Sequence, residues 1–300
     1  MFVITGASGN TGKIAAIELL KSGHKVKAIG RNADKMQDLK DLGAELAIGD
    51  LHNADFLTKE FADATAVYAV IPPNFTTENF RQYQNEVGSA INTALINANV
   101  NNVAVLSSIG AHLTENAGVV QGLYDFEQMF NKNENLNAVY LRAGYFFQNL
   151  FGQLHTIKNM GIMGSPMNGD MKVPMVYTGD IGKVAAEELI NLSEGKVTGK
   201  KVRYVAGQRD LSNNEVAKII GNSIGIENLP DVQFPYADAK AAMMAGGLTD
   251  SLSTGYLELS KSANEGKLLS DYVRNETNTT ETSIEWFAEN VFAPVYKAQF

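Results

Sequence analysis

Residues 1–13 read MFVITGASGNTGK, an apolar run followed by three glycines that recur at every third position. The run at residues 2–5 has the length and the β-branched content of a buried strand, and apolar side chains at helical spacing follow the loop. A glycine-rich loop between a strand and a helix can cradle a pyrophosphate. The stretch therefore predicts a dinucleotide-binding loop, with a purely structural turn as the alternative.

The glycine spacing is G-x-x-G-x-x-G, whereas the common dinucleotide fingerprint is G-x-G-x-x-G. The position of the loop, at the start of a series of alternating strands and helices, favours dinucleotide binding over a plain turn. The first turn of the helix adds unpaired N–H groups and the positive end of a dipole. We expect cofactor contacts from the loop residues Gly6, Ser8, Gly9, Asn10, Thr11 and Gly12.

Strand-like runs alternate with helix-like segments through the first half of the chain, which is typical of a parallel sheet covered on both faces. A helix is expected over residues 178–192, and a strand over 202–205 returns the chain to the sheet. We predict an α/β fold, a doubly wound Rossmann-type parallel sheet with a smaller, mostly helical C-terminal lobe. The other expected strands lie at residues 2–5, 26–30, 45–48, 66–71, 103–107 and 138–142.

A change of pattern along the chain predicts two structural units. Residues 1–150 and 176–206 are expected to form the dinucleotide-binding Rossmann domain. Residues 151–175 are rich in loops, and residues 207–300 hold short helices separated by Gly, Pro and Asn. We expect these two segments to form the smaller lobe, which would bind a substrate or a partner.

The composition narrows the range of partners. The 300 residues have 45% hydrophobic content and a formal net charge of −8 without a dense Lys/Arg run, so nucleic acid is not expected as a partner. No apolar stretch is long enough for a membrane span and no signal-like segment opens the chain, so we expect a cytoplasmic protein without a membrane partner. The chain has no cysteine and its four histidines are far apart, so no metal site is expected.

The segment after the second expected strand bears on the choice of cofactor. NAD sites usually place an acidic residue there, whereas a basic residue accommodates the 2′-phosphate of NADP. Here Gly30 takes that position and Arg31 follows it. We expect NADP(H) in preference to NAD(H), with Lys35 adding to the phosphate contact, and the alternative is that Arg31 is a solvated surface charge. Asp50 and Leu51 are expected at the adenine edge, although Asp50 would also suit a helix N-cap.

Six segments occur together in an order that is specific for one family. They are TGASGNTGK (5–13), GRNADK (30–35), GDL (49–51), LSSIGA (106–111), LRAGYFFQNL (141–150) and VPMVYTGDIGKVAAEEL (173–189). This set, which spans residues 1–192, resembles the NmrA-like group of atypical short-chain dehydrogenase/reductases. The resemblance implies NADP(H) binding and places Ser107 close to the nicotinamide. Ile71 and Pro72 end the fourth expected strand at the same edge of the sheet, and Tyr145 follows the sixth. We expect these three residues beside the cofactor as well, with plain loop termination as the alternative for Pro72. The group includes NADPH-dependent quinone and azo reductases, triphenylmethane-dye reductases, and regulators that bind the dinucleotide without turning it over.

Short-chain dehydrogenases typically use a Tyr-x-x-x-Lys pair, in which the lysine lowers the pKa of the tyrosine. The equivalent stretch here, GLYDFEQMF at residues 122–130, has Tyr124 but places Gln128 where the lysine would stand. A simple alcohol dehydrogenase is therefore not expected. Tyr124 and Ser107 are the candidate catalytic residues, and the alternative for Ser107 is a hydroxyl that satisfies backbone groups at a strand end.

A quinone-like acceptor fits this reduced machinery, because its reduction yields an oxyanion much less basic than an alkoxide. Phe146 and Phe147 follow the sixth strand at the carboxyl edge of the sheet, where open α/β folds bind ligands. We expect both, with His112, to contact a small apolar or aromatic substrate; core packing is the alternative for the phenylalanines and a surface loop for His112. The second function left open is a non-catalytic NAD(P)-binding redox sensor with a protein partner, and a homodimer is compatible with either.

Overall fold

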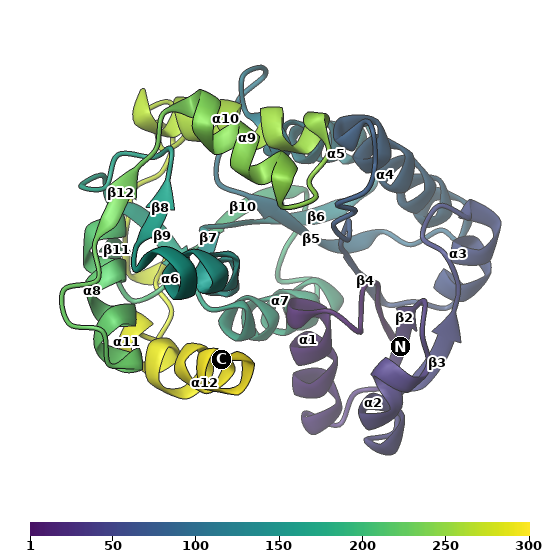
Figure 1. Ribbon diagram of the computed structural model, residues 1–300. Coiled ribbons are helices and arrows are strands. Elements are labelled where there is room, and N and C mark those ends of the chain that lie inside the picture. The colour runs from purple at the N-terminus through teal and green to yellow at the C-terminus, as the bar shows by residue number, and fades with distance from the viewer.

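The computed structural model describes all of residues 1–300, and a seven-stranded parallel sheet forms its centre (Figure 1). The strand order is β10-β6-β5-β4-β1-β2-β3, so the chain builds outward from β1 to one edge and then from β4 to the other. The reversal between β1 and β4 is the topological switch point of a doubly wound fold. The strands are β1 (Phe2–Ile4), β2 (Val26–Gly30), β3 (Glu45–Ile48), β4 (Ala66–Ala69), β5 (Asn102–Ser108), β6 (Asn137–Ala143) and β10 (Lys200–Val205).

Helices cover both faces of the sheet and bury an apolar core against each. Within β1, Phe2 and Ile4 belong to the core under α1 and α7, whereas Val3 belongs to the core under α3, α4 and α5, as the alternation of a strand requires. The doubly wound fold predicted from the sequence is thereby confirmed. No helix combines the length and the apolar character that crossing a membrane would need. The sheet helices are α1 (Asn10–Lys21), α2 (Gln37–Asp41), α3 (Ala54–Phe61), α4 (Phe80–Asn97), α5 (Gln121–Asn131) and α7 (Thr178–Ser193).

The smaller lobe follows the carboxyl ends of β6 and β10 and has a core of its own. It contains two small sheets, one with the order β11-β9-β7 and one that pairs β12 with β8. The sequence pattern does not indicate these strands, because runs this short are too brief to show an alternation. The lobe consists of β7 (Tyr145–Phe146), α6 (Leu154–Met160), β8 (Met163–Ser165), β9 (Val173–Val176), β11 (Asp210–Leu211), α8 (Asn213–Ile224), β12 (Asp231–Gln233), α11 (Ile284–Phe287) and α12 (Ala293–Gln299).

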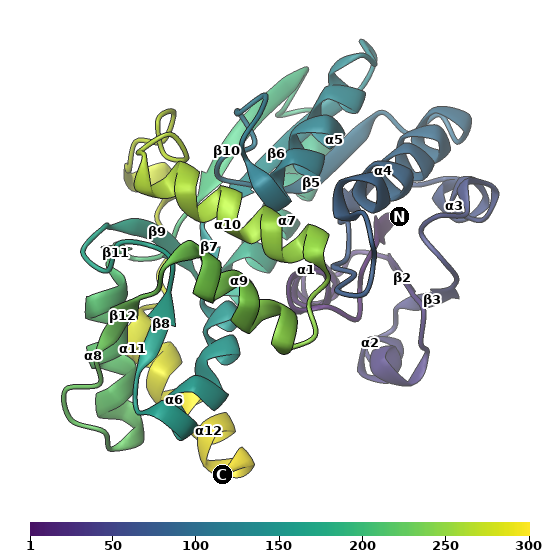
Figure 2. The ribbon, with the colours of Figure 1, turned by 45° about the horizontal axis from the view of Figure 1, so that its top comes forward.

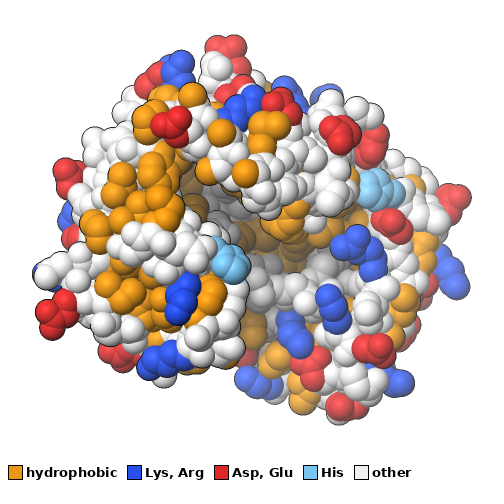
Figure 3. Space-filling view, in the orientation of Figure 1, with side chains coloured by type: hydrophobic (Ala, Val, Ile, Leu, Met, Phe, Trp, Pro, Cys, Tyr) orange, Lys and Arg blue, Asp and Glu red, His pale blue; other side chains and the backbone are white.

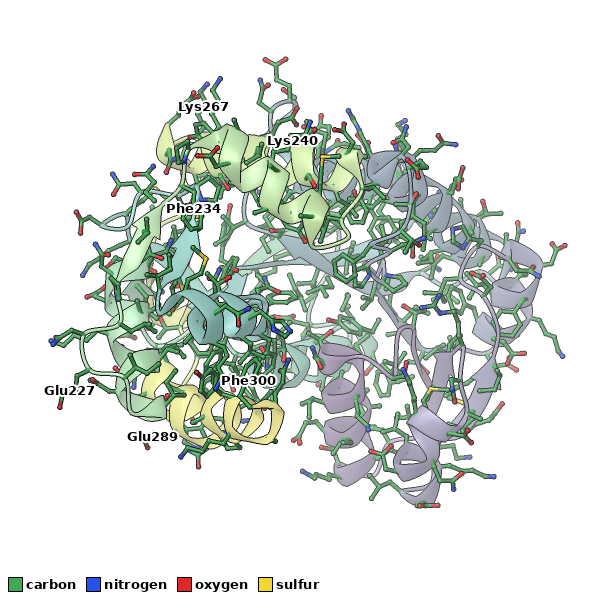
Figure 4. All side chains as sticks on the ribbon, viewed as in Figure 1. Glu227, Phe234, Lys240, Lys267, Glu289 and Phe300 are labelled. Carbon is green, nitrogen blue, oxygen red and sulfur yellow. The ribbon has the colours of Figure 1, made fainter.

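Two consecutive helices, α9 (Tyr236–Ala245) and α10 (Asp250–Asn264), reach from the lobe across to the sheet (Figure 2). At the start of α10, the Thr249 hydroxyl donates a 2.9 Å hydrogen bond to the Thr77 carbonyl in the loop that follows β4. Figure 4 labels Lys240 on α9, at the top of that view, opposite α12. The two helices therefore bridge the lobe and the strand ends of the Rossmann sheet.

Asp231 in β12 is a partly buried carboxylate whose Oδ2 atom is shielded from water and has no hydrogen-bond partner. Loss of hydration raises its pKa from 3.8 to about 6. Between these two values the folded protein keeps a proton on Asp231 that the unfolded chain has lost. The stabilisation by this proton is complete below the unfolded pKa and is lost as the pH rises through about 6.

We expect Asp231→Asn to raise the free energy of unfolding by about 2 kcal/mol at pH 8 and to change it little at pH 4. Asparagine resembles the protonated carboxyl group, so the mutation removes only the cost of burying the charged form, which is present at pH 8. Urea denaturation at the two pH values measures the difference. Asp63→Asn is the matched control, because Asp63 is exposed and its positive φ suits asparagine equally well. A gain of the same size at both pH values would contradict the assignment.

Candidate cofactor and acceptor site

A deep hollow opens in the centre of the molecule, between the sheet, the lobe and the helices α9 and α10 (Figure 3). Hydrophobic side chains lie along its floor, and Lys and Arg side chains gather on the wall at the right of the view. The switch point between β1 and β4 leads into this hollow. Open α/β sheets bind their ligands at the carboxyl ends of the strands near such a point, so the hollow is the candidate site.

The glycine loop after β1 leaves α1 with a free N-terminus at the hollow. Gly6 has a φ of +61°, which favours glycine, and its carbonyl accepts a 2.9 Å hydrogen bond from the Gly9 N–H. A Cβ at Gly12 would lie 2.6 Å from the Gly6 carbonyl oxygen, so the start of α1 can approach the loop only with glycine there. The N–H groups of Asn10, Thr11 and Gly12 have no acceptor within the protein. Three free N–H groups at a helix start suit a phosphate.

The loop side chains differ in what they offer a ligand. Ser8, Gly9 and Asn10 are exposed at the start of α1. Thr11 is 6% exposed, and its hydroxyl accepts a 3.2 Å hydrogen bond from the Tyr68 hydroxyl. The backbone N–H of Thr11 is therefore available to a phosphate, whereas its side chain connects α1 to β4.

The end of β2 carries a glycine in place of an acidic residue, and two free cations follow it. A Cβ at Gly30 would lie 2.8 Å from the sulfur of Met36, which is itself buried. Arg31 and Lys35 follow, both exposed, and neither side chain forms an ion pair or a hydrogen bond within the protein. Unpaired cations beside a phosphate-binding loop attract a further phosphate group. This arrangement fits the 2′-phosphate of NADP.

Asp50 shapes the turn that follows β3. Its carboxylate accepts from the His52 N–H at 3.0 Å and lies 2.8 Å from His52 Nδ1, and these hydrogen bonds hold the pKa of Asp50 below its ordinary value. Asp50 stays exposed, whereas Leu51 beneath it is buried. The N-cap of α3 is Asn53, which accepts from the Phe56 N–H at 3.0 Å, so the alternative interpretation of Asp50 as the cap is wrong.

The segment after β4 passes beside the glycine loop. The Tyr83 hydroxyl donates to the Pro72 carbonyl at 2.9 Å and holds the segment in place. A Cβ at Gly6 would lie 3.5 Å from the Cβ of Val70, so Val70 closes the back of the loop. Ile71 and Pro72 are partly exposed, as a contact with the cofactor would require.

Ser107 lies at the end of β5, but its hydroxyl is bound to a buried carboxylate. It donates to Glu127 Oε1 at 2.6 Å, and Glu127, which is 2% exposed, pairs with Arg142 at 2.7 Å. Arg142 also donates to Asp271 at 2.9 Å. A hydroxyl whose proton is held by a carboxylate cannot donate to an acceptor or to the nicotinamide. The bond to Glu127 replaces the backbone contact that was the alternative for Ser107 and argues against its role as a proton donor. The predicted cofactor contact stays a prediction, since the hydroxyl oxygen can still accept a hydrogen bond.

His112 contacts the C-terminal segment through both sides of its ring. Its Nδ1 lies 2.9 Å from Asp271 Oδ1, and its Nε2 lies 2.9 Å from the Ser270 hydroxyl. The Nε2 contact with Ser270 and the nearby Asp271 carboxylate hold the ring against the C-terminal segment, although Nδ1 has no aligned hydrogen bond. This geometry favours a structural tie over the predicted substrate contact of His112. This tie joins the loop after β5 to the segment before α11.

Tyr124 lies on α5 one turn before Glu127, on the side of the helix that faces the ends of β5 and β6. It is partly exposed, and its hydroxyl has no partner within the protein. Gln128 forms only a 3.4 Å contact with Asn131. Tyr124 is thus free to form a hydrogen bond with a ligand, but the lysine of the usual pair is missing.

The three aromatic residues after β6 have different surroundings. Phe147 is 1% exposed, and its ring centroid lies 5.4 Å from that of Phe287 in the core of the lobe. It has no surface for a substrate, so its predicted role is corrected to core packing. Phe146 packs partly against the core under α1 and α7. Tyr145 is 41% exposed and is the member of this group that borders open space.

A second depression lies on the outer face of α3 and α4. Polar side chains such as Asn79, Arg81 and Asn85 line most of it. It offers neither a phosphate-binding loop nor an apolar floor, so it does not compete with the hollow. No group of three or more His, Cys, Asp or Glu side chains is arranged to hold a metal ion.

Two parts of this region are not predicted by the sequence reasoning. The buried Glu127–Arg142 pair has a local signal, because Arg142 stands in an otherwise apolar strand and a charge there needs a partner. The helix α10, which reaches from the lobe across to the sheet, has no such signal. Only the tertiary structure brings that helix to the site.

The glycine loop, the free N–H groups and the unpaired cations define a Rossmann-type dinucleotide-binding protein. The chain belongs to the NmrA-like family, whose model matches residues 1–272. An NAD(P)H azoreductase of Xenophilus azovorans is 26% identical over 262 residues, which cover 86% of this chain and 86% of the relative.

Two solved structures show how widely this fold is used. An NADPH-dependent quinone oxidoreductase of Escherichia coli, crystallised with NADPH, has a TM-score of 0.80 and 22% identity, over 97% of this chain and all of that one. NmrA, a negative transcriptional regulator crystallised with NADP, has a TM-score of 0.69 and 15% identity, over 99% of this chain and 97% of that one. An enzyme and a regulator thus share the architecture of this chain.

Proposed function

We propose that this protein is an NADPH-dependent reductase that transfers hydride to a quinone-like or other conjugated, apolar acceptor. The observation that carries the proposal is the unpaired Arg31 beside Gly30, next to a loop that presents free N–H groups at the switch point of the sheet. Similarity to an azoreductase and to a quinone oxidoreductase supports the acceptor class.

The residues of the chain fit this cofactor. The N–H groups of residues 10–12 would hold the pyrophosphate, and Arg31 with Lys35 would hold the 2′-phosphate. Asp50 is exposed near Arg31 and would meet the adenosine part. When bound, the reduced nicotinamide supplies a hydride. Gly30 stands where NAD sites place an acidic side chain, so the site favours NADPH.

Both the missing tyrosine–lysine pair and the hydrophobic floor of the site indicate the class of acceptor. Reduction of a quinone takes up one hydride and one proton from water and gives the hydroquinone. The oxyanion formed on the way is weakly basic, so no tyrosine–lysine pair is needed. The protein has to hold a flat apolar ring against the cofactor, and the hydrophobic floor of the hollow suits this task (Figure 3).

Turnover by the purified protein tests the proposal. Consumption of NADPH is followed with 1,4-naphthoquinone, with an azo dye and with a triphenylmethane dye, in parallel with NADH, and both cofactors are titrated by fluorescence. The proposal predicts turnover with a clear preference for NADPH. Tight NADPH binding without turnover of any of the three acceptors would contradict it and would favour a redox sensor.

We expect Tyr124→Phe to keep kcat/KM for 1,4-naphthoquinone within about tenfold of the wild type, since water can supply the proton. Steady-state kinetics with NADPH measures the effect. Tyr296→Phe, in the lobe core beside Phe300, is the matched control and should leave kcat/KM unchanged. A thousandfold loss in Tyr124→Phe alone would mean that this phenol is the proton donor after all.

A further inference from the structure

The turn that follows β3 places the Asp50 carboxylate at the edge of the dinucleotide-binding region. Strands β2 and β3 form one edge of the large sheet (Figure 1), and their register sets Gly30 opposite Ile48. The Gly49 N–H donates to the Gly30 carbonyl at 3.1 Å, so the two chains stay side by side beyond β3. Asp50 therefore follows at the carboxyl ends of these strands, on the same side as Arg31, where we expect the adenosine half of NADP(H).

His52 holds the Asp50 side chain in one orientation. The His52 backbone N–H donates to Asp50 Oδ1 at 3.0 Å, and the ring Nδ1 lies 2.8 Å from the same oxygen. A carboxylate only accepts hydrogen bonds, so Nδ1 carries the hydrogen. The Asp50 side chain is 62% exposed, and its Oδ2 has no partner within the protein. One carboxylate oxygen is thus occupied by His52, and the other is left for a donor on a ligand.

The His52 ring is itself held by the first turn of α4. Its centroid lies 5.3 Å from that of Tyr83, which is buried in the core under α3, α4 and α5. The Tyr83 ring stacks on Phe80, with the centroids 6.3 Å apart, and the Tyr83 hydroxyl donates to the Pro72 carbonyl at 2.9 Å. A chain of contacts therefore runs from Asp50 through His52 and Tyr83 to the segment after β4. It joins the ends of two strands, β3 and β4, that are separated in the sheet by β1 and β2.

We propose that His52 is a positioning residue for the adenosine half of NADP(H), which fixes Asp50 so that its Oδ2 accepts a hydrogen bond from the amino group of adenine. The inference rests on the cofactor part of the proposed function and is independent of the acceptor. An exposed aspartate that nothing holds samples several rotamers, and ordering it during binding weakens the affinity. His52 orders Asp50 before the cofactor arrives. The free oxygen can accept but not donate, so it favours adenine over a base that has a carbonyl oxygen in place of the amino group.

The first test compares the Kd of NADPH with that of deamino-NADPH, in which a carbonyl oxygen replaces the amino group of adenine. We expect the wild type to bind NADPH about tenfold more tightly, the effect of one hydrogen bond to a charged group. His52→Ala should weaken NADPH binding by about tenfold and deamino-NADPH binding by less than about twofold, so that the preference is lost. Fluorescence titration measures these values without turnover, so a protein that reduces no quinone would give the same result.

Two conservative variants separate the hydrogen bond from the ring packing. His52→Asn keeps an N–H group near the place of Nδ1 and should retain most of the preference for NADPH, although it loses the ring contact with Tyr83. His52→Phe keeps an aromatic ring on Tyr83 but has no donor, so it should lose the preference as His52→Ala does. His24→Ala is the matched control, because His24 precedes β2 at the amino end of the sheet, and it should change neither Kd.

A ligand without adenosine separates positioning from damage to the fold. Reduced nicotinamide mononucleotide should bind the wild type and all four variants with Kd values within about twofold of one another. Equal losses of NADPH and deamino-NADPH affinity in His52→Ala, or equal affinities of the wild type for the two, would overturn the role of His52. So would a preference that His52→Phe retains and His52→Asn loses. A wild type that binds neither dinucleotide would reject the cofactor site itself.

Discussion

Replacing Arg31 with Asp is expected to weaken NADPH binding by at least about 100-fold and to leave NADH binding within about threefold. Arg31 is exposed and has no partner within the protein, so the substitution breaks no structural contact. The new carboxylate would repel a 2′-phosphate, whereas it would accept hydrogen bonds from the ribose hydroxyls of NADH. Fluorescence titration of both cofactors with the variant measures the two affinities.

Two further variants separate the phosphate contact from general charge. Lys35→Ala should weaken NADPH binding by no more than about tenfold, since Lys35 adds a point charge to a contact that Arg31 dominates. Lys40→Ala removes another exposed cation farther along the same segment and should alter neither cofactor. Equal losses of NADPH and NADH affinity in Arg31→Asp would remove the assignment of the 2′-phosphate to this corner.

Replacing Glu127 with Ala is expected to lower the free energy of unfolding by about 3–5 kcal/mol. The carboxylate is buried, and it accepts from both Ser107 and Arg142. Its removal would leave a guanidinium that is only 9% exposed with Asp271 as its remaining carboxylate partner. Chemical denaturation compares the variant with the wild type.

A carboxylate on the same helix serves as the control. Asp125 pairs with Arg81 at 2.7 Å, but the Arg81 side chain is 53% exposed, so Asp125→Ala should cost less than about 1 kcal/mol. Adding Arg142→Met to Glu127→Ala should recover part of the lost stability, because the unpaired charge is then gone. A loss of under about 1 kcal/mol in Glu127→Ala itself would show that the buried pair does little for the fold.

The Rossmann part of the fold is readable from the sequence because its strands are buried on both faces and separated by amphipathic helices. All seven strands of the large sheet were expected, and the largest differences are at β10, which begins at Lys200 rather than at residue 202, and at β4, which ends at Ala69 rather than at residue 71. There the Val70 N–H turns to the Thr5 hydroxyl, at 2.9 Å, and leaves the ladder. The sequence does not predict the small sheets of the lobe, because their strands are short and pair with segments far away in sequence.

The residues of the candidate site also fall into two groups, those that the local sequence places and those that depend on distant partners. The glycine loop and Arg31 are local features, and a strand, a turn and a helix start suffice to place them. Ser107, His112 and Phe147 depend on partners from distant segments, namely Glu127, the segment 270–271 and Phe287. Sequence position alone put these three side chains at the right edge of the sheet. It does not reveal that each is already engaged by the protein.

The most direct test of the reductase proposal is a single-turnover experiment. Protein loaded with NADPH is mixed anaerobically with an equal amount of 1,4-naphthoquinone, and both NADP⁺ and the hydroquinone are quantified. We expect one hydroquinone for each NADPH oxidised, at a rate far above that of NADPH and quinone without protein. Oxidation of the bound NADPH no faster than in the protein-free mixture would contradict the account. It would identify the chain as a dinucleotide-binding protein without reductase activity on quinones.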